Sequence, residues 1–186
     1  MRTAREPHPK DRLLRTASRL FYAEGIHAVG VDRLVTEAAV TRATFYRHFP
    51  GKDDLVVAYL KAASEAIREV VGRVRKGKAP REALIATMSV IGDATCEDDF
   101  RGCRFLNAAA EYPDPGHPVR AVIDDHRTWF LGVLRDLAAD LGHPDSDHAA
   151  RVLVLLRDGA LHGGELDDPA VVRETLRRAV EDVIPH

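Results

Sequence analysis

Long apolar runs, a secretion signal and enough cysteines for a disulfide framework are all missing from this sequence. No apolar stretch approaches the roughly 20 residues that a membrane-spanning helix requires. The first twelve residues are polar and basic, without the apolar segment of a secretory signal peptide. Cys96 and Cys103 are the only cysteines, which are too few for a disulfide framework. We therefore expect a cytoplasmic protein with no membrane partner.

Signatures of catalysis and of metal binding are also missing. The sequence contains no nucleophile elbow, no phosphate-binding glycine loop, no zinc signature and no paired catalytic carboxylates. Asp124, Asp125, His126 and His162 lack the spacing of metal ligands. The sequence therefore predicts a protein that is not an enzyme and that uses no cofactor and no metal ion.

Positive charge is concentrated at the start of the chain, although the net formal charge is only −2. Residues 1–52 hold ten lysines and arginines against five acidic residues, whereas the remaining residues hold 17 against 24. A basic first quarter on an acidic remainder indicates that one face meets a polyanion. An ordinary solvated surface is the alternative that charge alone leaves open.

Apolar residues recur at spacings of three and four along nearly the whole chain, while the alternation typical of strands is scarce. This pattern predicts an all-α fold. A polar stretch at residues 72–80 is the expected boundary between two modules. The expected helices cover approximately residues 13–21, 34–38, 41–49, 55–74, 84–91, 104–111, 119–141, 146–162 and 171–183.

The segment at residues 40–49 has the features of a helix that reads the major groove of DNA. Thr41 can cap its first turn, and Phe45 and Phe49 lie one turn apart, facing inward. An ordinary amphipathic helix with a solvated polar face fits the periodicity equally well. The outward side carries hydrogen-bond donors for phosphates or base edges on Arg42, Thr44, Tyr46, Arg47 and His48.

Three stretches of residue types at fixed spacing favour the DNA-binding interpretation. They are Ala17 with Leu20-Phe21 and Glu24-Gly25, then VDRLVTEA at residues 31–38, and then VTRATFYRHFPGK at residues 40–52. With these stretches, residues 11–60 closely resemble the DNA-binding domain of the tetracycline-repressor (TetR) family. The third stretch is similar to the family's VSxxTxYxxFxxK signature.

The resemblance implies two domains in one all-α chain. Residues 1–54 would form a three-helix helix-turn-helix DNA-binding domain, and residues 55–186 a helical domain for dimerisation and effector binding. The function implied is that of a sequence-specific regulator of transcription. We expect a repressor that a small-molecule effector of unknown identity releases from double-stranded operator DNA.

The resemblance also implies roles for individual residues. The positions of Tyr46 and Lys52 commonly contact phosphates in the family, and we expect His48 to join them. Arg42 and Thr44 are expected at base edges. Arg2 and Arg5 could form an arm that adds salt-dependent affinity. The full expected DNA-binding set is Thr41, Arg42, Ala43, Thr44, Tyr46, Arg47, His48 and Lys52.

Two positions depart from the family's pattern. Ala39 stands in the turn where the family usually has glycine, and a positive φ there would cost an alanine on the order of 1 kcal/mol. Gly30 stands where the family often has Ser or Thr at the start of the second helix. Glycine can cap a helix but offers no hydroxyl to a phosphate.

The expected eighth helix is apolar on nearly every side, through VLVLL at residues 152–156. Such a helix should be buried from two directions. It is either a central core helix or part of a homodimer interface, in which the last two helices meet their symmetry mates as a four-helix bundle. We favour the homodimer, since a palindromic operator requires two heads.

The effector site leaves the weakest trace in the sequence. Residues 101–118 resemble a stretch found in one branch of the family, and a pocket needs apolar walls with a few polar anchors. Ordinary core packing is the alternative for each candidate, and oxidant sensing is a further alternative for Cys103. The expected lining is Met88, Cys103, Phe105, Asn107, His126 and Trp129.

Overall fold

The structure, a computed structural model, describes residues 7–185. Within this range the chain forms nine helices and no strand, which confirms the predicted all-α fold. Arg2 and Arg5 of the expected arm lie outside the described residues. The helices are α1 Pro9–Glu24, α2 Val31–Glu37, α3 Arg42–His48, α4 Lys52–Arg75, α5 Pro80–Ala94, α6 Arg104–Glu111, α7 Pro118–Asp140, α8 Ser146–Gly163 and α9 Pro169–Val183.

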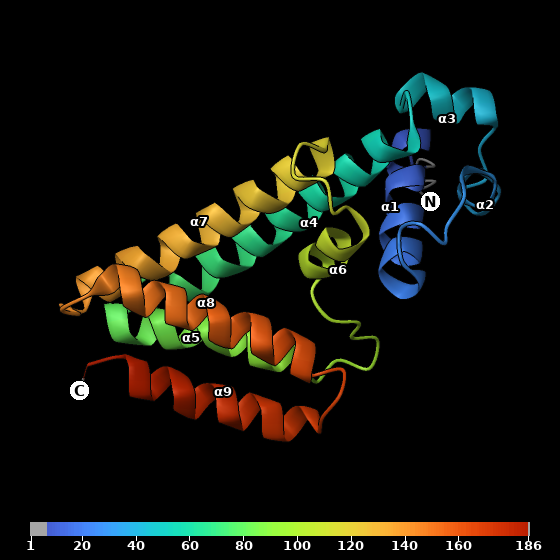
Figure 1. Cartoon of the computed structure of the whole chain (residues 1–186). Helices are drawn as coiled ribbons and strands as arrows, with labels where there is room; N and C mark the ends of the chain where they lie inside the picture. The colour runs from blue at the N-terminus through green and yellow to red at the C-terminus, as the bar shows by residue number, and fades with distance from the viewer. Residues whose placement is uncertain (1–6, 186) are drawn as a thin grey trace, which may run out of the picture.

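The first three helices form a small head at one end of the molecule (Figure 1). Leu13, Leu20, Leu34 and Phe45 bring side chains from all three helices into its core, and none of them is exposed. Helix α1 ends at Gly25, whose φ of 89° is a conformation that glycine adopts without strain. The side chains that the apolar spacing predicts to face inward therefore form the core of the head.

Helix α4 carries the chain from the head into the body, where it packs along α7 (Figure 1). Asp54 in its first turn accepts a hydrogen bond from the backbone N–H of Gly51, at 2.8 Å, which caps the helix. The buried residues Leu55, Tyr59 and Leu60 follow at helical spacing. The aromatic ring of Tyr59 packs edge-on against Phe21 of α1, with 5.7 Å between centroids, so α4 also helps to close the head.

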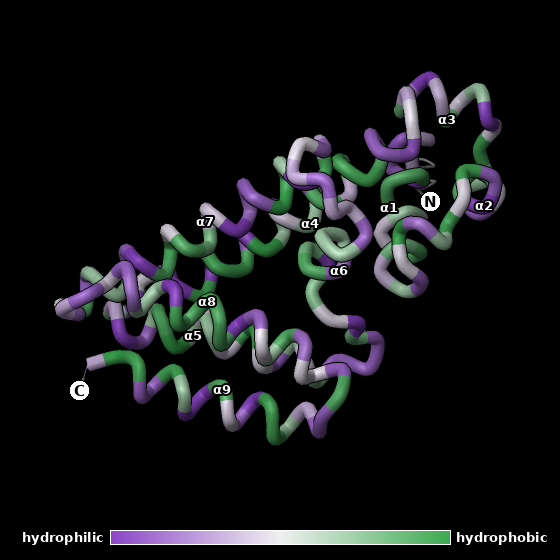
Figure 2. Tube along the Cα trace, in the orientation of Figure 1, coloured by the Kyte–Doolittle hydropathy of each residue, from purple (hydrophilic) through white to green (hydrophobic). Residues whose placement is uncertain are grey.

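The body is a helical bundle of α4, α5, α7, α8 and α9, with the short α6 lying between it and the head (Figure 1). Hydrophobic residues recur along each of these helices (Figure 2), and the buried ones among them belong to one core. Helices α5 and α9 approach closely at Gly92, where a Cβ atom would lie 2.9 Å from the Cγ atom of Arg173. No helix in residues 7–185 is both long and apolar enough to cross a lipid bilayer.

The apolar helix α8 has only one buried side within a single chain. Leu153 and Val154 lie in the core, whereas Leu155 is 68% exposed. The sequence predicts burial from two directions, and this chain by itself supplies only one of them. A second apolar side is thus left on the surface of the protomer.

Candidate functional site

The turn between α2 and α3 determines how α3 is presented. Ala39 has a φ of 52°, so the alanine adopts the left-handed conformation for which glycine is better suited. Arg12 of α1 donates from Nε to the carbonyl of Ala38 and from Nη2 to that of Ala39, each at 3.1 Å. The turn keeps the conformation that a glycine would adopt, and a side chain from α1 holds it.

Thr41 caps α3 as the sequence predicts. Its Oγ1 accepts a hydrogen bond from the backbone N–H of Thr44 at 3.1 Å, and Phe45 below it is fully buried. Gly30 occupies the corresponding position before α2 with an extended backbone and no side-chain hydrogen bond. The two caps therefore differ in whether they offer a hydroxyl.

The outer face of α3 carries the predicted donors. Tyr46 is 50% exposed and stands edge-on against Phe45, with 5.1 Å between centroids. Arg47 and Ala43 are exposed, and an Nη2 of Arg47 donates to the Thr44 hydroxyl at 3.3 Å. The side chains of Thr44, Tyr46 and Arg47 thus offer hydrogen-bonding groups on the helix whose Phe45 is fully buried.

His48 closes this surface at the end of α3. Its ring packs edge-on against His8 with 5.3 Å between centroids. Desolvation, followed by the neighbouring His8, holds the pKa of His48 below its usual value. A neutral imidazole of this kind offers a single N–H donor rather than a positive charge.

Ion pairs hold two of the basic residues on α1 and α2. Arg33 donates to Glu24 at 2.8 Å and to Glu37 at 2.9 Å, and Arg19 also pairs with Glu37. The positive charge of the head is therefore balanced locally around Arg19 and Arg33.

Arg42 at the start of α3 is held in the same way. Its Nε donates to Asp32 of α2 at 2.7 Å, and this hydrogen bond, followed by the carboxylate charge, raises the pKa of the guanidinium. Both side chains are largely exposed. The pair fixes the direction of Arg42 relative to α2, and solvent screening keeps its contribution to stability small.

Lys52 is half-buried rather than freely extended. Its ammonium nitrogen lies 6.0 Å from the centroid of the Phe21 ring, and burial lowers its pKa. The residue is the first of α4 and follows the loop that leaves α3. The sequence places Lys52 next to the α3 face but does not reveal its packing against α1.

A cavity of about 480 Å³ lies in the body and extends to the head. Of the expected effector-binding residues, Cys103, Phe105 and His126 line it together. Apolar side chains of α4 and α5, Ile67, Val70 and Val90 among them, form much of the wall. The structure therefore brings half of the expected set to one place.

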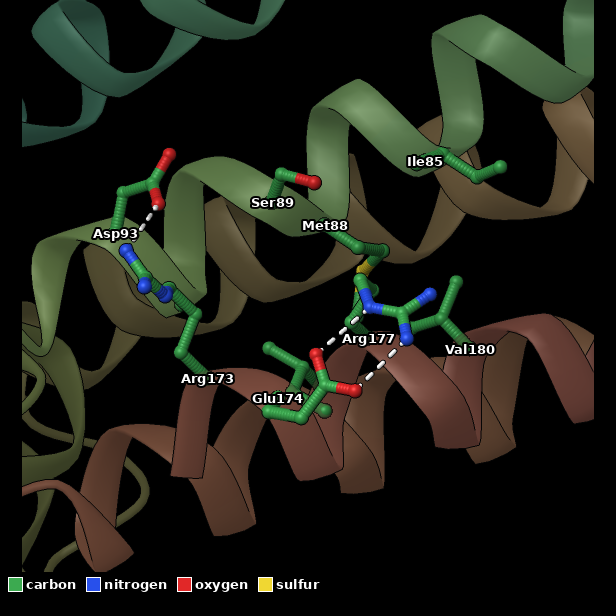
Figure 3. Close-up of a pocket in the computed structure, with 10 residues that line it drawn as sticks. Ile85, Met88, Ser89, Asp93, Arg173, Glu174, Arg177 and Val180 are labelled. Carbon is green, nitrogen blue, oxygen red and sulfur yellow. Dashed lines mark hydrogen bonds and ion pairs between the residues drawn. The ribbon is translucent and has the colours of Figure 1, made fainter. Parts of the chain in front are cut away.

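The other three expected residues lie elsewhere. Met88 lies in a groove between α5 and α9, which Arg177 and its ion-pair partner Glu174 also line (Figure 3). Asn107 donates from its amide to the carbonyl of Arg101 at 2.7 Å. Trp129 packs under the guanidinium of Arg68, 4.6 Å from its carbon atom.

His126 is a buried polar group of the cavity lining. Its Nδ1 lies 3.0 Å from the hydroxyl of Ser64, and its ring stacks on Phe105 with 3.8 Å between centroids. Desolvation, followed by Arg157 and Arg68, lowers the pKa of His126 to about 3. The imidazole is therefore neutral at physiological pH.

Cys103 stands at the start of α6, next to the buried Arg157. An Nη2 of Arg157 donates to the sulfur at 3.4 Å, while its Nη1 pairs with Asp158 at 2.7 Å. The second cysteine, Cys96, is exposed. Among the described residues, no group of three or more His, Cys, Asp or Glu side chains has an arrangement that could hold a metal ion.

Sequence reasoning missed Ser18 and Tyr22 of α1, which also line the cavity. The Tyr22 hydroxyl donates to the carbonyl of Gly102 at 3.1 Å and accepts from the N–H of Arg101 at 2.8 Å. These partners lie about 80 positions away along the chain. Helical periodicity carries no signal for such a contact.

The capped α3 on a three-helix head has the arrangement of a helix-turn-helix regulator of transcription. A family model described as "Bacterial regulatory proteins, tetR family" matches residues 13–59. The crystal structure of SCO4454, a TetR-family transcriptional regulator from Streptomyces coelicolor, is 51% identical, with a TM-score of 0.91 over 94% of this chain and 93% of that one. The chain belongs to the TetR family.

Two further relatives match over almost their whole length. A putative TetR-type regulator from Streptomyces avermitilis is 30% identical, with a TM-score of 0.85 over 97% of this chain and all 100% of that chain. The HTH-type transcriptional regulator YjdC of Escherichia coli is 21% identical over 94% of this chain and 93% of its own length. The similarity therefore includes the body as well as the head.

Proposed function

We propose that the chain is a homodimeric repressor that binds operator DNA through α3 and leaves it when a small molecule fills the cavity. The observation that carries this proposal is the outer face of α3, where Tyr46 and Arg47 are exposed over the fully buried Phe45. A rigid helix with donors on one side and a core on the other is what major-groove recognition requires.

Within this interface the residues divide by chemistry. Arg42 and Thr44 reach base edges, Arg42 after exchanging its bond with Asp32 for an acceptor on a base. Tyr46, His48 and Lys52 contact phosphates. Thr41, Ala43 and Arg47 complete the surface that enters the groove.

The homodimer forms through α8 and α9. An apolar groove of about 580 Å³ runs between these helices, and Leu155 and Val171 beside it are 68% and 60% exposed. Exposed apolar surface of this kind is typical of an interface between subunits. A two-fold axis here would place two α3 helices on the two halves of a palindromic operator.

The cavity provides the means of release. Its volume falls within the range of small-molecule sites, and its walls combine apolar side chains with a few polar groups. An effector that binds one head orientation better than the other shifts the population toward that orientation. The factor by which the effector lowers affinity for operator DNA equals the factor by which bound DNA lowers affinity for the effector.

The experiment begins with selection of bound duplexes from random DNA, followed by mobility-shift titration over a range of salt. We expect Lys52→Ala to weaken binding and to reduce the slope of log affinity against log salt by about 0.9 for each phosphate that the variant no longer neutralises. Tyr46→Ala should weaken binding with little change of slope, because the side chain carries no charge. Lys61→Ala, which removes an exposed lysine elsewhere on α4, is the matched control.

Two results would contradict the interface. One is binding by the Lys52 and Tyr46 variants that equals that of the unmodified protein. The other is a Lys61→Ala variant that loses as much affinity as Lys52→Ala, which would show that any lysine on α4 contributes through general charge.

A further inference from the structure

The cavity in the body has one wall made by the DNA-binding head. Ser18 and Tyr22 of α1 line it together with Tyr59 of α4 and Cys103 and Phe105 around the start of α6. A molecule that fills this space touches the head directly. It does not have to act on the head through α4 alone.

Tyr22 joins the head to the loop that precedes α6. Its hydroxyl uses both hydrogen-bonding roles, as donor to Gly102 and as acceptor from Arg101. The guanidinium carbon of Arg104 lies 4.0 Å from the centre of the Tyr22 ring. The same side chain thus lines the cavity and holds the loop through its hydroxyl.

The buried part of the cavity lining carries no unpaired charge. Glu97, Asp99 and Arg104 line the cavity but are exposed. Among the buried side chains of the lining, Arg157 pairs with Asp158, and His126 is neutral. A buried ionic ligand needs a partner of opposite charge, and the buried lining offers no unpaired one.

We propose that the cavity binds an uncharged, mainly apolar ligand that contacts Tyr22, and that the Tyr22 hydroxyl couples occupancy to the orientation of the head. This inference rests on the proposed function, since it assigns the ligand class and the coupling residue of the same cavity. The ligand packs against the Tyr22 ring and changes its two hydrogen bonds to the loop. The head then moves relative to α6, and operator affinity changes.

The ligand class is tested with two dyes that differ by one sulfonate. N-phenyl-1-naphthylamine is uncharged, and 8-anilino-1-naphthalenesulfonate is its anionic counterpart. We expect the uncharged dye to bind at least about tenfold more tightly, a difference of about 1.4 kcal/mol. Ala66→Phe, which places a ring at the cavity wall, should weaken its binding, whereas Ala121→Phe at an exposed position on α7 should not.

The coupling is tested with Tyr22→Phe, which keeps the ring and removes the hydroxyl. In the unmodified protein, saturation with N-phenyl-1-naphthylamine should change affinity for the selected duplex by about fivefold or more. The Tyr22→Phe protein, compared at a dye concentration that saturates it, should lose most of this change. Tyr112→Phe is the matched control, because its hydroxyl also joins two distant segments, donating at 2.9 Å to Asp53 in the first turn of α4, but does not line the cavity.

Hydrogen exchange provides a readout that needs no DNA. Saturation with the dye should alter amide exchange in peptides that contain residues 18–25 and 97–104 in the unmodified protein, and not in the Tyr22→Phe protein. If no duplex is selected, the proposed function fails, while dye binding and exchange still test the cavity.

Three results would overturn the inference itself. The first is preferential binding of the anionic dye, and the second is dye binding that Ala66→Phe leaves intact. The third is coupling that survives in Tyr22→Phe or disappears equally in Tyr112→Phe.

Discussion

A single alanine sets the geometry of the recognition helix. Ala39 adopts a φ of 52°, where its Cβ atom crowds the neighbouring carbonyl oxygen. Arg12 donates to the carbonyls of Ala38 and Ala39 and so helps to hold this strained turn. The conflict between residue and conformation was predictable from the sequence, but the arginine from α1 that stabilises the turn was not.

Ala39→Gly should stabilise the protein by about 0.5 to 1 kcal/mol, since relief of the left-handed strain exceeds the added entropy of the unfolded chain. Urea unfolding measures the change. Ala38→Gly is the control, because Ala38 has a φ of −79° and gains nothing from glycine. Equal destabilisation by both substitutions would show that the turn carries no strain.

Among the elements, α6 joins the cavity to the head. It follows directly on Cys103 in the cavity lining and ends at Glu111. The carboxylate of Glu111 accepts hydrogen bonds from the backbone N–H groups of Ile26 and His27, at 2.8 and 2.6 Å. These N–H groups belong to the turn between α1 and α2. One short helix thus touches both the cavity and the backbone of the head.

Glu111→Ala should destabilise the protein by about 1 to 3 kcal/mol, because two backbone donors lose a charged acceptor. Urea unfolding of the whole chain provides the measurement. Glu65→Ala, an exposed glutamate on α4, should change stability by less than about 0.5 kcal/mol. A Glu111 variant as stable as the Glu65 variant would mean that water replaces the carboxylate at no cost.

Apolar spacing predicts the elements well and their partners poorly. The bounds expected for α6, residues 104–111, are those observed, since a cluster of prolines and glycines follows it in the sequence. Periodicity shows that one side of α5 is buried but does not show which helix covers Met88. In the structure Met88 lies against α9, away from the cavity that Cys103 and Phe105 line, so its predicted place among the cavity residues is wrong.

Polar contacts between distant segments are the part of the site that no local pattern encodes. Glu111 reaches backbone groups 84 and 85 positions earlier in the chain, and any exposed glutamate would look the same in the sequence. The sequence likewise gives the net charge of the head but does not reveal that Asp32 pairs with Arg42 and Glu37 with Arg33. The residue types on the outer face of α3 can be read from the sequence, whereas the ion pairs and hydrogen bonds that hold them cannot.

At the scale of the whole molecule, the groove between α8 and α9 is the surface that a single chain leaves open. Leu155, Val171 and Val172 lie along it, and Leu155 and Val171 are both exposed in the single chain. Burying this surface in a dimer would supply the second direction of packing that the apolar sequence of α8 predicts.

Leu155→Glu should convert a dimer into a monomer, because a carboxylate would lose its water in the centre of the interface. Sedimentation at micromolar concentration measures the mass. Leu166→Glu is the matched control, since Leu166 is 80% exposed but does not line the groove. An unmodified protein that sediments as a monomer, or a Leu155 variant that remains a dimer, would contradict this assembly.

Helix α4 packs both on the head and on the helices of the body, which limits how hybrid proteins can be assembled from related regulators. A junction after residue 54 would separate the head from Tyr59, whose ring lies against Phe21, and from the buried Leu55 and Leu60. The transferred head would then pack against apolar side chains of α4 that come from a different protein. A donor head therefore needs to bring its own chain as far as position 60 if it is to retain its fold and its preference for a DNA sequence.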